Sequence, residues 1–322
     1  MKVLLFAENP PSIYGGIERH CLNIINLFYN SEVEITMISK NNIPHYYIKG
    51  INKIVFKKKQ LKKIIINSQC DVIHIHGFAS IAVYQVLKTA LKLHMKTIYT
   101  GHFHPFKTLD NPFLGKCFFY FLLSPILPKI HHIITINNED TLFFKKYNKH
   151  ITMIPNWLQV INYNAIKVKH KSNMILFVGR NDRNKSPEYL IDIPKEYEVH
   201  CVTNSIRRLR NDFIIHKKIT DYELNKLYEQ TSLLVVPSRY EAFSYVVLES
   251  LIKGTPVLIS DQVRIIDHLN GISGITIFKY GDKNDFYKKI KIAMQQSVDV
   301  KKVMDRFNSN IIRKQLLNIY QS

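Results

Sequence analysis

Two carboxylates stand eight residues apart in the stretch SRYEAFSYVVLES, at Glu241 and Glu249. The apolar run LLVVP (233–237) precedes them and predicts a buried parallel strand. The run LIKGTPVLIS follows, where Gly254 can close a helix before the next strand begins. We therefore expect a strand, a loop and a helix in this order, with Glu241 in the loop and Glu249 on the helix.

A helix that begins near Ser244 points its first backbone N–H groups at whatever lies above its N-terminus. The amides of Ala242, Phe243 and Ser244 would then form an anion site, because these groups carry partial positive charge. One acid before the helix and one along its side could accept hydrogen bonds from two different sugars around a bound phosphate. A nucleoside diphosphate sugar has this layout of sugar, phosphates and ribose.

A basic motif, GRNDRNK (179–185), directly follows the apolar run MILFV. Its Arg180 and Lys185 could neutralise a diphosphate leaving group, because Arg binds oxygens bidentately and Lys acts as a point charge. A solvated basic loop would have the same composition. The motif therefore supports a phosphate site only in combination with others.

Gly15 and Gly16 follow the first apolar run and open the first helical pattern, IERHCLNIINLFYN (17–30). Glycines at this point let backbone N–H groups approach a phosphate closely, although an ordinary tight turn also uses them. The pair is not part of a GxGxxG motif. A nicotinamide dinucleotide therefore has little support.

Short β-rich runs alternate with helical patterns along the chain, which predicts an α/β protein with doubly wound parallel sheets. One series occupies residues 1–165 and a second occupies 170–302, with a polar, Lys-rich linker in 151–173. An amphipathic helix is expected at 303–322. Two Rossmann-like halves of this kind place a ligand cleft between them, at the carboxyl ends of the strands.

The chain has 322 residues and a formal net charge of +20. Its length is typical of two domains with a core each, and the charge suits nucleic acid, an anionic membrane face or phosphorylated substrates. Abundant Lys can account for part of it. The four cysteines are far apart, which favours a reducing compartment, and the first apolar run is too short for a signal peptide. We expect a cytoplasmic protein.

Histidines gather at the predicted strand ends. His74 and His76 lie on one face of DVIHIHG (71–77), and His102 and His104 repeat this spacing. Zinc would need a third or fourth ligand and supporting outer contacts, which the sequence does not identify. No DxD pair stands out for Mg²⁺. We therefore expect histidines that line a polar cleft, with no metal site, no essential metal and no cofactor.

Five motifs in order along the chain, GGIERH, TGH, IPN, GR-x4-K and E-x7-E, resemble those of the retaining GT-B glycosyltransferases of family four. The resemblance implies an acceptor-binding domain at 1–165, a nucleotide-sugar-binding domain at 170–302, and a helix at 303–322 that packs back on the first. It implies transfer of a hexosyl or N-acetylhexosaminyl group from a UDP- or GDP-sugar to a glycan or lipid-linked saccharide. Synthesis of O-antigen, capsule or lipopolysaccharide is the expected context.

The resemblance also implies roles for single residues. The sugar being transferred would contact Glu241 and His102, the ribose Glu249, the diphosphate Arg180 and Lys185, and the base the backbone at Ile219. The catalytic set is then His102, Arg180, Lys185 and Glu241, and the donor-binding set is Gly15, Gly16, Ile219, Ala242, Phe243, Ser244 and Glu249.

Two alternatives remain open at the level of the sequence. A GT-B sugar-nucleotide epimerase would act on the donor without an acceptor. A basic nucleic-acid-binding protein would suit the charge, but the basic runs are not interleaved with aromatic residues and no known binding motif is present, so we expect no nucleic-acid partner.

The segment 106–132 is rich in Phe, Tyr and Leu and carries Lys107, Lys116 and Lys129. Its most apolar stretch, FFYFLLSPILP (118–128), is too short to span a bilayer, but an apolar face flanked by Lys can bind at an anionic membrane surface. A core helix would be equally apolar. We expect a peripheral protein on the inner face of the cytoplasmic membrane, with this segment facing lipid.

Overall fold

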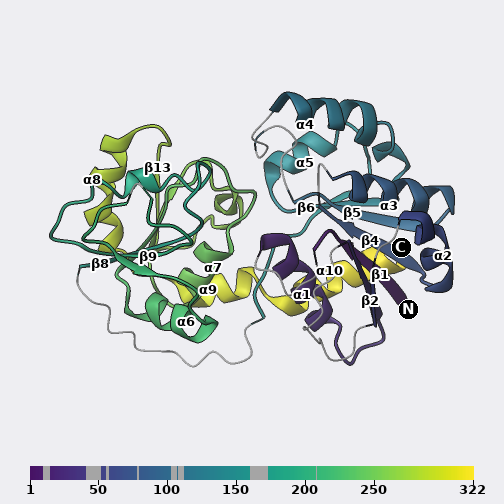
Figure 1. Ribbon diagram of the computed structural model, residues 1–322. Coiled ribbons are helices and arrows are strands. Elements are labelled where there is room, and N and C mark those ends of the chain that lie inside the picture. The colour runs from purple at the N-terminus through teal and green to yellow at the C-terminus, as the bar shows by residue number, and fades with distance from the viewer. Residues whose placement is uncertain are drawn as a thin grey trace. The chain divides into compact units, whose positions relative to one another are not determined.

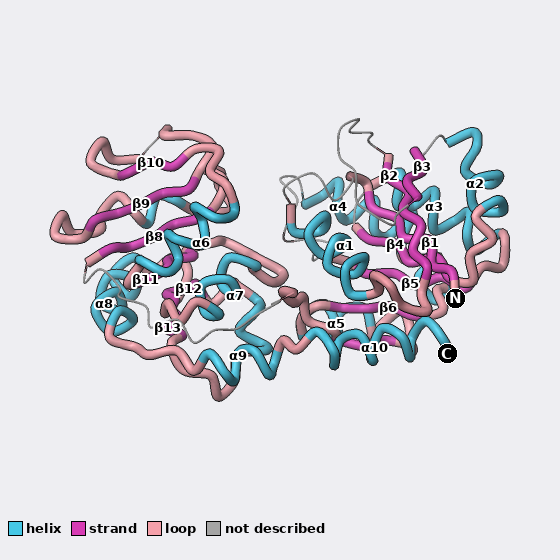
Figure 2. The backbone as a smooth tube through the Cα atoms, turned by 90° about the horizontal axis from the view of Figure 1, so that it is seen from below, coloured by secondary structure: helices cyan, strands magenta, loops and turns pink. Residues whose placement is uncertain are grey.

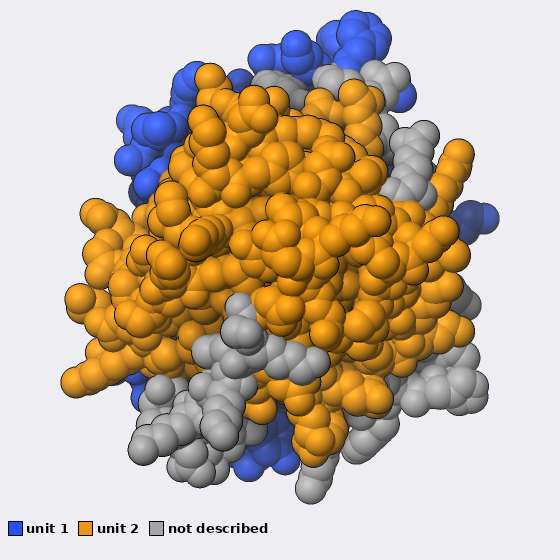
Figure 3. Space-filling model, turned by 90° about the vertical axis from the view of Figure 1, so that its left-hand side faces the viewer, with its two compact units in different colours: residues 1–159, 308–322 blue, residues 160–307 orange. Residues whose placement is uncertain are grey.

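The chain divides into two compact units, which Figure 3 shows in different colours. Unit 1 comprises residues 1–159 and 308–322, and unit 2 comprises residues 160–307. The predicted domain boundaries at 165 and 170 lie outside the described residues, as do residues 160–172 of the expected linker. The computed structural model describes residues 1–9, 15–40, 52–55, 58–77, 80–102, 107, 112–159, 173–207 and 209–322.

Unit 1 is built on a parallel sheet that has seven strands among the described residues (Figure 1). Buried apolar runs such as KVLLFA form the central strands, as expected for a sheet covered on both faces. The first strand pairs with the second on one side and the fourth on the other, so the strand order reverses there. The order is β3 (Asn52–Val55), β2 (Glu34–Ser39), β1 (Lys2–Ala7), β4 (Val72–His76), β5 (Lys96–Thr100), β6 (His132–Thr135) and β7 (Ile151–Met153).

The two faces of β4 differ in chemistry because side chains alternate along a strand. Ile73 and Ile75 join the apolar core. His74 and His76 point to the other face, and both are fully buried. The helices of unit 1 are α1 (Gly16–Leu27), α2 (Leu61–Asn67), α3 (Ile81–Lys92), α4 (Pro112–Phe118), α5 (Asn138–Phe144) and α10 (Ser309–Gln321), with short turns at η1 (Lys58–Gln60), η2 (Phe119–Leu123) and η3 (Leu127–Lys129).

The strand β7 differs from the expectation from the sequence, which places ITM at 151–153 in the linker. These residues pair with β6, with Ile151 beside Ile133 and Met153 beside Thr135. All three are only half-buried, so a strand this short at the sheet edge leaves no apolar alternation to recognise.

The predicted single helix at 303–322 is wrong: two helices occupy this stretch. The first, α9 (Val300–Arg306), belongs to unit 2, and α10 begins after Asn308 and belongs to unit 1. The Asn308 side chain accepts a hydrogen bond from the amide of Asn310. This cap satisfies a donor that a helix start otherwise leaves open, and so it favours a new helix here.

Helix α10 is anchored in unit 1 by buried contacts, and Figure 1 shows it in yellow alongside the strands of that unit. The Tyr320 hydroxyl lies 2.8 Å from His74 Nδ1, although the two residues are 246 positions apart. Lys96 Nζ donates to the Tyr320 carbonyl at 2.9 Å. Ile312, Leu316 and Ile319 are buried on the same helix.

Unit 2 has a second parallel sheet, with six strands among the described residues; Figure 2 shows β10, β9, β8 and β11 side by side. Its strand order reverses between β8 and β11. The order is β10 (Ile214–His216), β9 (Glu198–Val202), β8 (Met174–Val178), β11 (Leu233–Val236), β12 (Val257–Ser260) and β13 (Ile275–Phe278). The helices are α6 (Asp221–Gln230), α7 (Tyr245–Ile252), α8 (Lys283–Met294) and α9, with short turns at η4 (Pro187–Tyr189) and η5 (Arg264–His268).

The segment 106–132 has two apolar faces in its described part. Phe119 in the π-helical turn η2 and Leu127 join the core of unit 1 with no exposed surface. Phe113 on α4 is 70% exposed and Phe121 on η2 is 78% exposed. One face of the described segment therefore belongs to the core and another exposes apolar side chains, and contact with lipid stays a prediction. Among the described residues, no helix is long and apolar enough to cross a membrane.

Candidate active site

Two loops meet where the strand order of unit 2 reverses. In a parallel sheet of this kind the crevice at the carboxyl ends of such strands is the usual ligand site. The loop after β8 contains Asn184, whose side-chain amide donates to the Tyr240 carbonyl at 3.0 Å. The carbonyl of Asn184 accepts from the Arg239 amide at 2.7 Å. Asn184, which the motifs did not single out, thus ties the loop after β8 to the loop after β11.

Lys185 and Glu241 form an ion pair at this crossing. Lys185 Nζ lies 2.8 Å from Glu241 Oε1, and the two side chains are only 20% and 11% exposed. Ser238 Oγ donates to the same carboxylate oxygen at 2.5 Å. The sequence analysis selected both charged residues but predicted contacts with different parts of the donor. The structure brings them into direct contact.

Arg180 lies apart from this pair. Its side chain is 74% exposed, and its guanidinium lies 3.2 Å from the carboxylate of Asp182 in the same loop. In this loop Lys185 is thus held in a partly buried ion pair, whereas Arg180 is mostly exposed. The joint role expected for Arg180 and Lys185 stays a prediction.

The helix α7 begins at Tyr245, as the position of Ser244 predicted. Ala242, Phe243 and Ser244 are all buried before it. Ser244 has a φ of 136°, a conformation that non-glycine residues adopt rarely and that often marks ligand sites. Its hydroxyl oxygen is buried and has no hydrogen-bond partner among the described residues. The start of α7 therefore combines backbone donors with an unsatisfied hydroxyl.

Glu249 is 9% exposed, on α7 as expected. The hydroxyl of Tyr228 on α6 donates to its Oε2 at 2.7 Å, and Tyr228 is itself 1% exposed. The sequence analysis missed Tyr228, because DYELNKLYEQT predicted only an amphipathic helix. The Tyr228 hydroxyl holds the Glu249 carboxylate in one orientation.

Ile219 lies half-buried in the loop between β10 and α6. The next residue, Thr220, caps α6 and forms a reciprocal capping box with Glu223. Such a cap fixes the path of the chain at a helix start. The backbone around Ile219 is thereby held in place, as a contact with a base would require.

Gly15 and Gly16 begin α1, beside the reversal of strand order in unit 1. A Cβ on Gly15 would lie 2.0 Å from Glu18 Oε2, so a larger residue there would require the Glu18 carboxylate to move. Asn9 donates to the other oxygen of Glu18 at 2.9 Å. At Gly16 a Cβ would meet nothing within 4 Å. Glu18, which the sequence analysis did not select, thus explains Gly15, while Gly16 is open.

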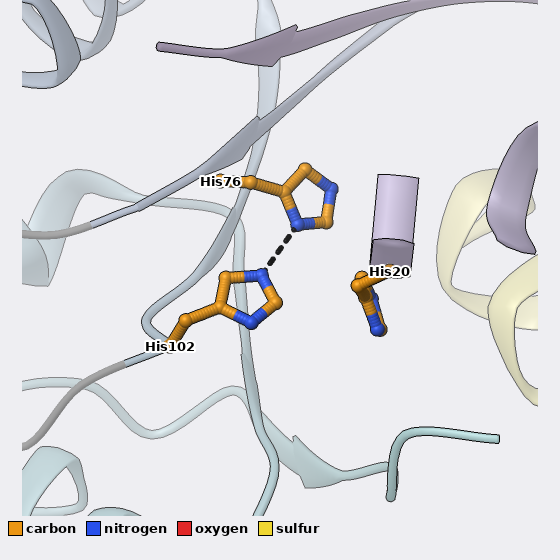
Figure 4. A group of neighbouring side chains, drawn as sticks. All are labelled: His20, His76 and His102. Atoms are coloured by element: carbon orange, nitrogen blue, oxygen red, sulfur yellow. Dashed lines mark hydrogen bonds between the residues drawn. The ribbon is translucent and has the colours of Figure 1, made fainter. Parts of the chain in front are cut away.

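His102 belongs to a cluster of three histidines at the carboxyl edge of the sheet of unit 1. His76 ends β4, His102 follows β5 and His20 comes from α1 (Figure 4). His76 Nδ1 and His102 Nε2 share a hydrogen bond of 3.0 Å. All three side chains are buried. The third histidine that the sequence did not identify is therefore His20, whereas His104 lies outside the described residues.

Burial shifts the titration of this cluster. It lowers the pKa of His20 to about 4, although the side chain of Asn156 opposes the shift. Burial also holds the pKa of His76 and His102 well below the ordinary value, and the neighbouring histidines add to the effect. The three imidazoles are therefore uncharged at neutral pH.

Comparisons with known proteins agree with the fold. Residues 14–160 match a family model described as Glycosyltransferase Family 4, and residues 172–296 match one described as Glycosyl transferases group 1. HepE of Anabaena, solved in complex with UDP and glucose, superposes with a TM-score of 0.73. The superposition covers 99% of this chain and 98% of that chain, at 14% identity. This similarity establishes the fold alone.

Two curated relatives align over most of their length. An uncharacterised glycosyltransferase of Methanocaldococcus jannaschii is 27% identical over 84% of this chain and 84% of its own. The O-antigen chain mannosyltransferase of Salmonella typhimurium is 26% identical over 71% of this chain and 68% of its own. The two family models together span residues 14–160 and 172–296, and with the shared fold they support a group 1 glycosyltransferase with the GT-B fold.

Proposed function

We propose that the protein is a retaining glycosyltransferase of family four. It moves a hexosyl or N-acetylhexosaminyl group from a UDP- or GDP-sugar to a hydroxyl of a glycan or lipid-linked saccharide. The observation that carries the proposal is the Lys185–Glu241 ion pair beside the start of α7. A cation, a carboxylate and helix amides at one point are suited to a phosphate that carries a sugar.

In this proposal the ion pair is the resting state of the donor site. An incoming diphosphate takes over Lys185, because its charge exceeds that of a carboxylate, and Arg180 swings in from solvent as the second cation. Glu241 is then free to accept hydrogen bonds from the sugar. The amides of Ala242, Phe243 and Ser244 stabilise the charge that develops on the departing diphosphate, so no metal ion is needed there.

The remaining residues have positioning roles in the same proposal. Glu249 binds the ribose, the backbone at Ile219 binds the base, and Gly16 offers an amide near the diphosphate. His102 contacts the sugar being transferred. HepE binds UDP and glucose, and the Salmonella relative acts in O-antigen synthesis, which supports a nucleotide-sugar donor and a cell-surface saccharide acceptor.

The test is a panel of UDP- and GDP-sugars assayed for nucleotide release, with and without lipid-linked saccharide acceptors. The proposal requires release with at least one donor and dependence on acceptor. Conversion of the donor to an epimer without an acceptor would favour the epimerase instead. Retention is read from the anomeric configuration of the isolated product by NMR.

Replacing Glu249 by Gln is expected to raise KM for the donor about tenfold with little change in kcat. The ribose is remote from the bond that breaks, so its contact contributes equally to the ground and transition states. Initial rates over a range of donor concentrations measure both constants. A large fall in kcat at saturating donor with unchanged KM would reverse the role given to Glu249.

Tyr228→Phe is the matched control for this variant, because it removes only the hydroxyl that orients Glu249. It should change KM in the same direction and by less than Glu249→Gln. Phenylalanine keeps the ring and its packing, so the circular dichroism spectrum should stay unchanged.

The protein is also expected to bind anionic membranes through the exposed face of 112–123. Phe113 and Phe121 supply apolar surface, and each lysine of the 106–132 segment that reaches anionic lipid adds about 1 kcal/mol. Lys107 is paired with Glu139 and should contribute less. Liposome flotation measures this: the protein should float with phosphatidylserine vesicles at low salt and less at high salt.

The combined variant Phe113→Ser and Phe121→Ser should abolish flotation. Ile206→Ser, at a position 58% exposed in unit 2, is the matched control and should float as wild type does. Sedimentation of the wild type away from anionic vesicles at low salt would refute membrane binding by this face.

A further inference from the structure

The three-histidine cluster of unit 1 has more ring nitrogens than hydrogen-bond partners. Three neutral imidazoles offer three N–H donors and three lone pairs. Within the described residues, His20 Nδ1 and His76 Nε2 are buried and have no partner. A buried polar atom without a partner keeps the cost of its lost hydration unless something satisfies it. The cluster therefore calls for a ligand.

The arrangement of the rings suggests what this ligand is. One ligand nitrogen from each of His20, His76 and His102 can be chosen so that all three lie within 4.8 Å of one another. A tetrahedral zinc ion with Zn–N bonds of about 2.0–2.1 Å holds its nitrogens roughly 3.3 Å apart. His76 Nδ1 and His102 Nε2 are already 3.0 Å apart. The spread of the three nitrogens, at most 4.8 Å, would have to close toward this separation when a metal binds.

We propose that His20, His76 and His102 bind a zinc-like transition-metal ion, with a fourth position left for water. Imidazole is the ligand that Zn²⁺, Co²⁺ and Ni²⁺ share, and three histidines with an open position are a known zinc arrangement. The cluster contains no carboxylate or carbonyl of the kind that Mg²⁺ and Ca²⁺ require. Their absence from this three-residue group favours a transition metal.

The surroundings of the cluster supply outer contacts of the kind that metal-binding histidines use. A histidine that binds through one nitrogen usually donates from the other. The Asn156 side chain lies within reach of His20 and raises its pKa, but its buried Oδ1 makes no hydrogen bond of good geometry among the described residues. The ring of His74 lies against that of His76, tilted by 41° with centroids 4.1 Å apart, and His74 is held by Tyr320 and Thr100. A metal bound to one ring nitrogen of His20 would leave the other nitrogen to donate a hydrogen bond to Asn156 Oδ1.

The proposed ion shares one residue, His102, with the proposed donor site. The residues proposed for the diphosphate, Lys185 and Arg180, belong to unit 2, whereas all three histidines belong to unit 1. Only His102 has a part in both proposals, as a contact to the sugar and as a ligand. Binding assays without donor or acceptor therefore test the metal site regardless of whether the enzyme transfers sugar.

The experiment is a Co²⁺ titration of the full chain after treatment with a chelator, followed by visible absorption. Tetrahedral Co²⁺ gives bands that octahedral aqueous Co²⁺ lacks at the same strength. One equivalent should bind and be displaced by one equivalent of Zn²⁺. His20→Gln and, separately, His76→Gln should each lower the affinity by about a hundredfold or more, the upper end of the loss seen when metal-site contacts are removed.

The matched control is the double variant His200→Gln and His216→Gln in unit 2, whose rings also touch, at 2.9 Å between Nδ1 and Nε2. This variant should keep the Co²⁺ bands. Circular dichroism confirms that each variant is folded, and Asn156→Ala gives a second, milder test with about tenfold weaker binding. The proposal is overturned if wild type shows no tetrahedral bands, if the bands survive in His20→Gln, or if they disappear in the control.

Discussion

Lys185→Ala is expected to lower turnover about a hundredfold or more at saturating donor, as loss of a charge-stabilising group in an active site typically does. The variant removes the held cation of the donor site and leaves Glu241, whose side chain is 11% exposed, without its ion pair. Glu241→Ala should cause a loss of similar size. Nucleotide release under single-turnover conditions measures the chemical step directly.

The ion pair predicts a specific pattern in the double variant. Lys185 and Glu241 lie 2.8 Å apart, so the losses of turnover caused by the two single substitutions should not add. The turnover of the double variant should lie within about tenfold of that of the less active single variant. Lys283→Ala is the matched control, since it breaks an ion pair with Asp192 in the same unit whose side chains are 47% and 50% exposed. Near-wild-type turnover in a folded Lys185→Ala would remove this residue from the mechanism.

Leu316→Ala is expected to destabilise unit 1 by about 2–5 kcal/mol, because it leaves a cavity under α10. The single tryptophan of the chain, Trp157, is fully buried in unit 1, so its fluorescence reports the unfolding of that unit. Urea titration should show the midpoint of this signal shifted to lower concentration. A loss of this size is a large share of the stability of a typical domain.

Ile311→Ala is the control for this helix, because Ile311 is 54% exposed on α10. It should change the free energy of unfolding by less than about 0.5 kcal/mol. Equal effects of the two variants would mean that α10 does not pack on unit 1 through the face that contains Leu316.

The sheets were largely predictable from the sequence. Buried parallel strands are continuous apolar runs, and MILFV, LLVVP and PVLIS each correspond to a strand within a residue or two. The edge strand at 151–153 and the break at Phe307 were not predictable. The edge strand has no apolar alternation that would reveal it. The break at Phe307 depends on the helix cap that Asn308 provides, and the amphipathic pattern runs through this position without interruption.

The site was predictable in its residue types and not in its contacts. Motif spacing selected Lys185 and Glu241, but their ion pair joins residues 56 positions apart, and only the strand order fixes that distance in space. The same holds for His20, which has no spacing relation to His76 or His102. Tyr228 and Asn184 were missed because a hydroxyl or an amide within an ordinary helix or loop has no pattern of its own.

The place of α10 along the chain also affects how unit 1 can fold during synthesis. Residues 1–159 leave the ribosome before unit 2, yet α10, with Leu316 and Tyr320, is translated after it. Until then His74 lacks the hydroxyl that it meets across 246 residues, and the apolar surface under α10 stays open. Unit 2 is contiguous and can complete its folding first. Unit 1 therefore stays incomplete until α10 is made, and a chain stopped before α10 would expose that apolar surface to chaperones and proteases.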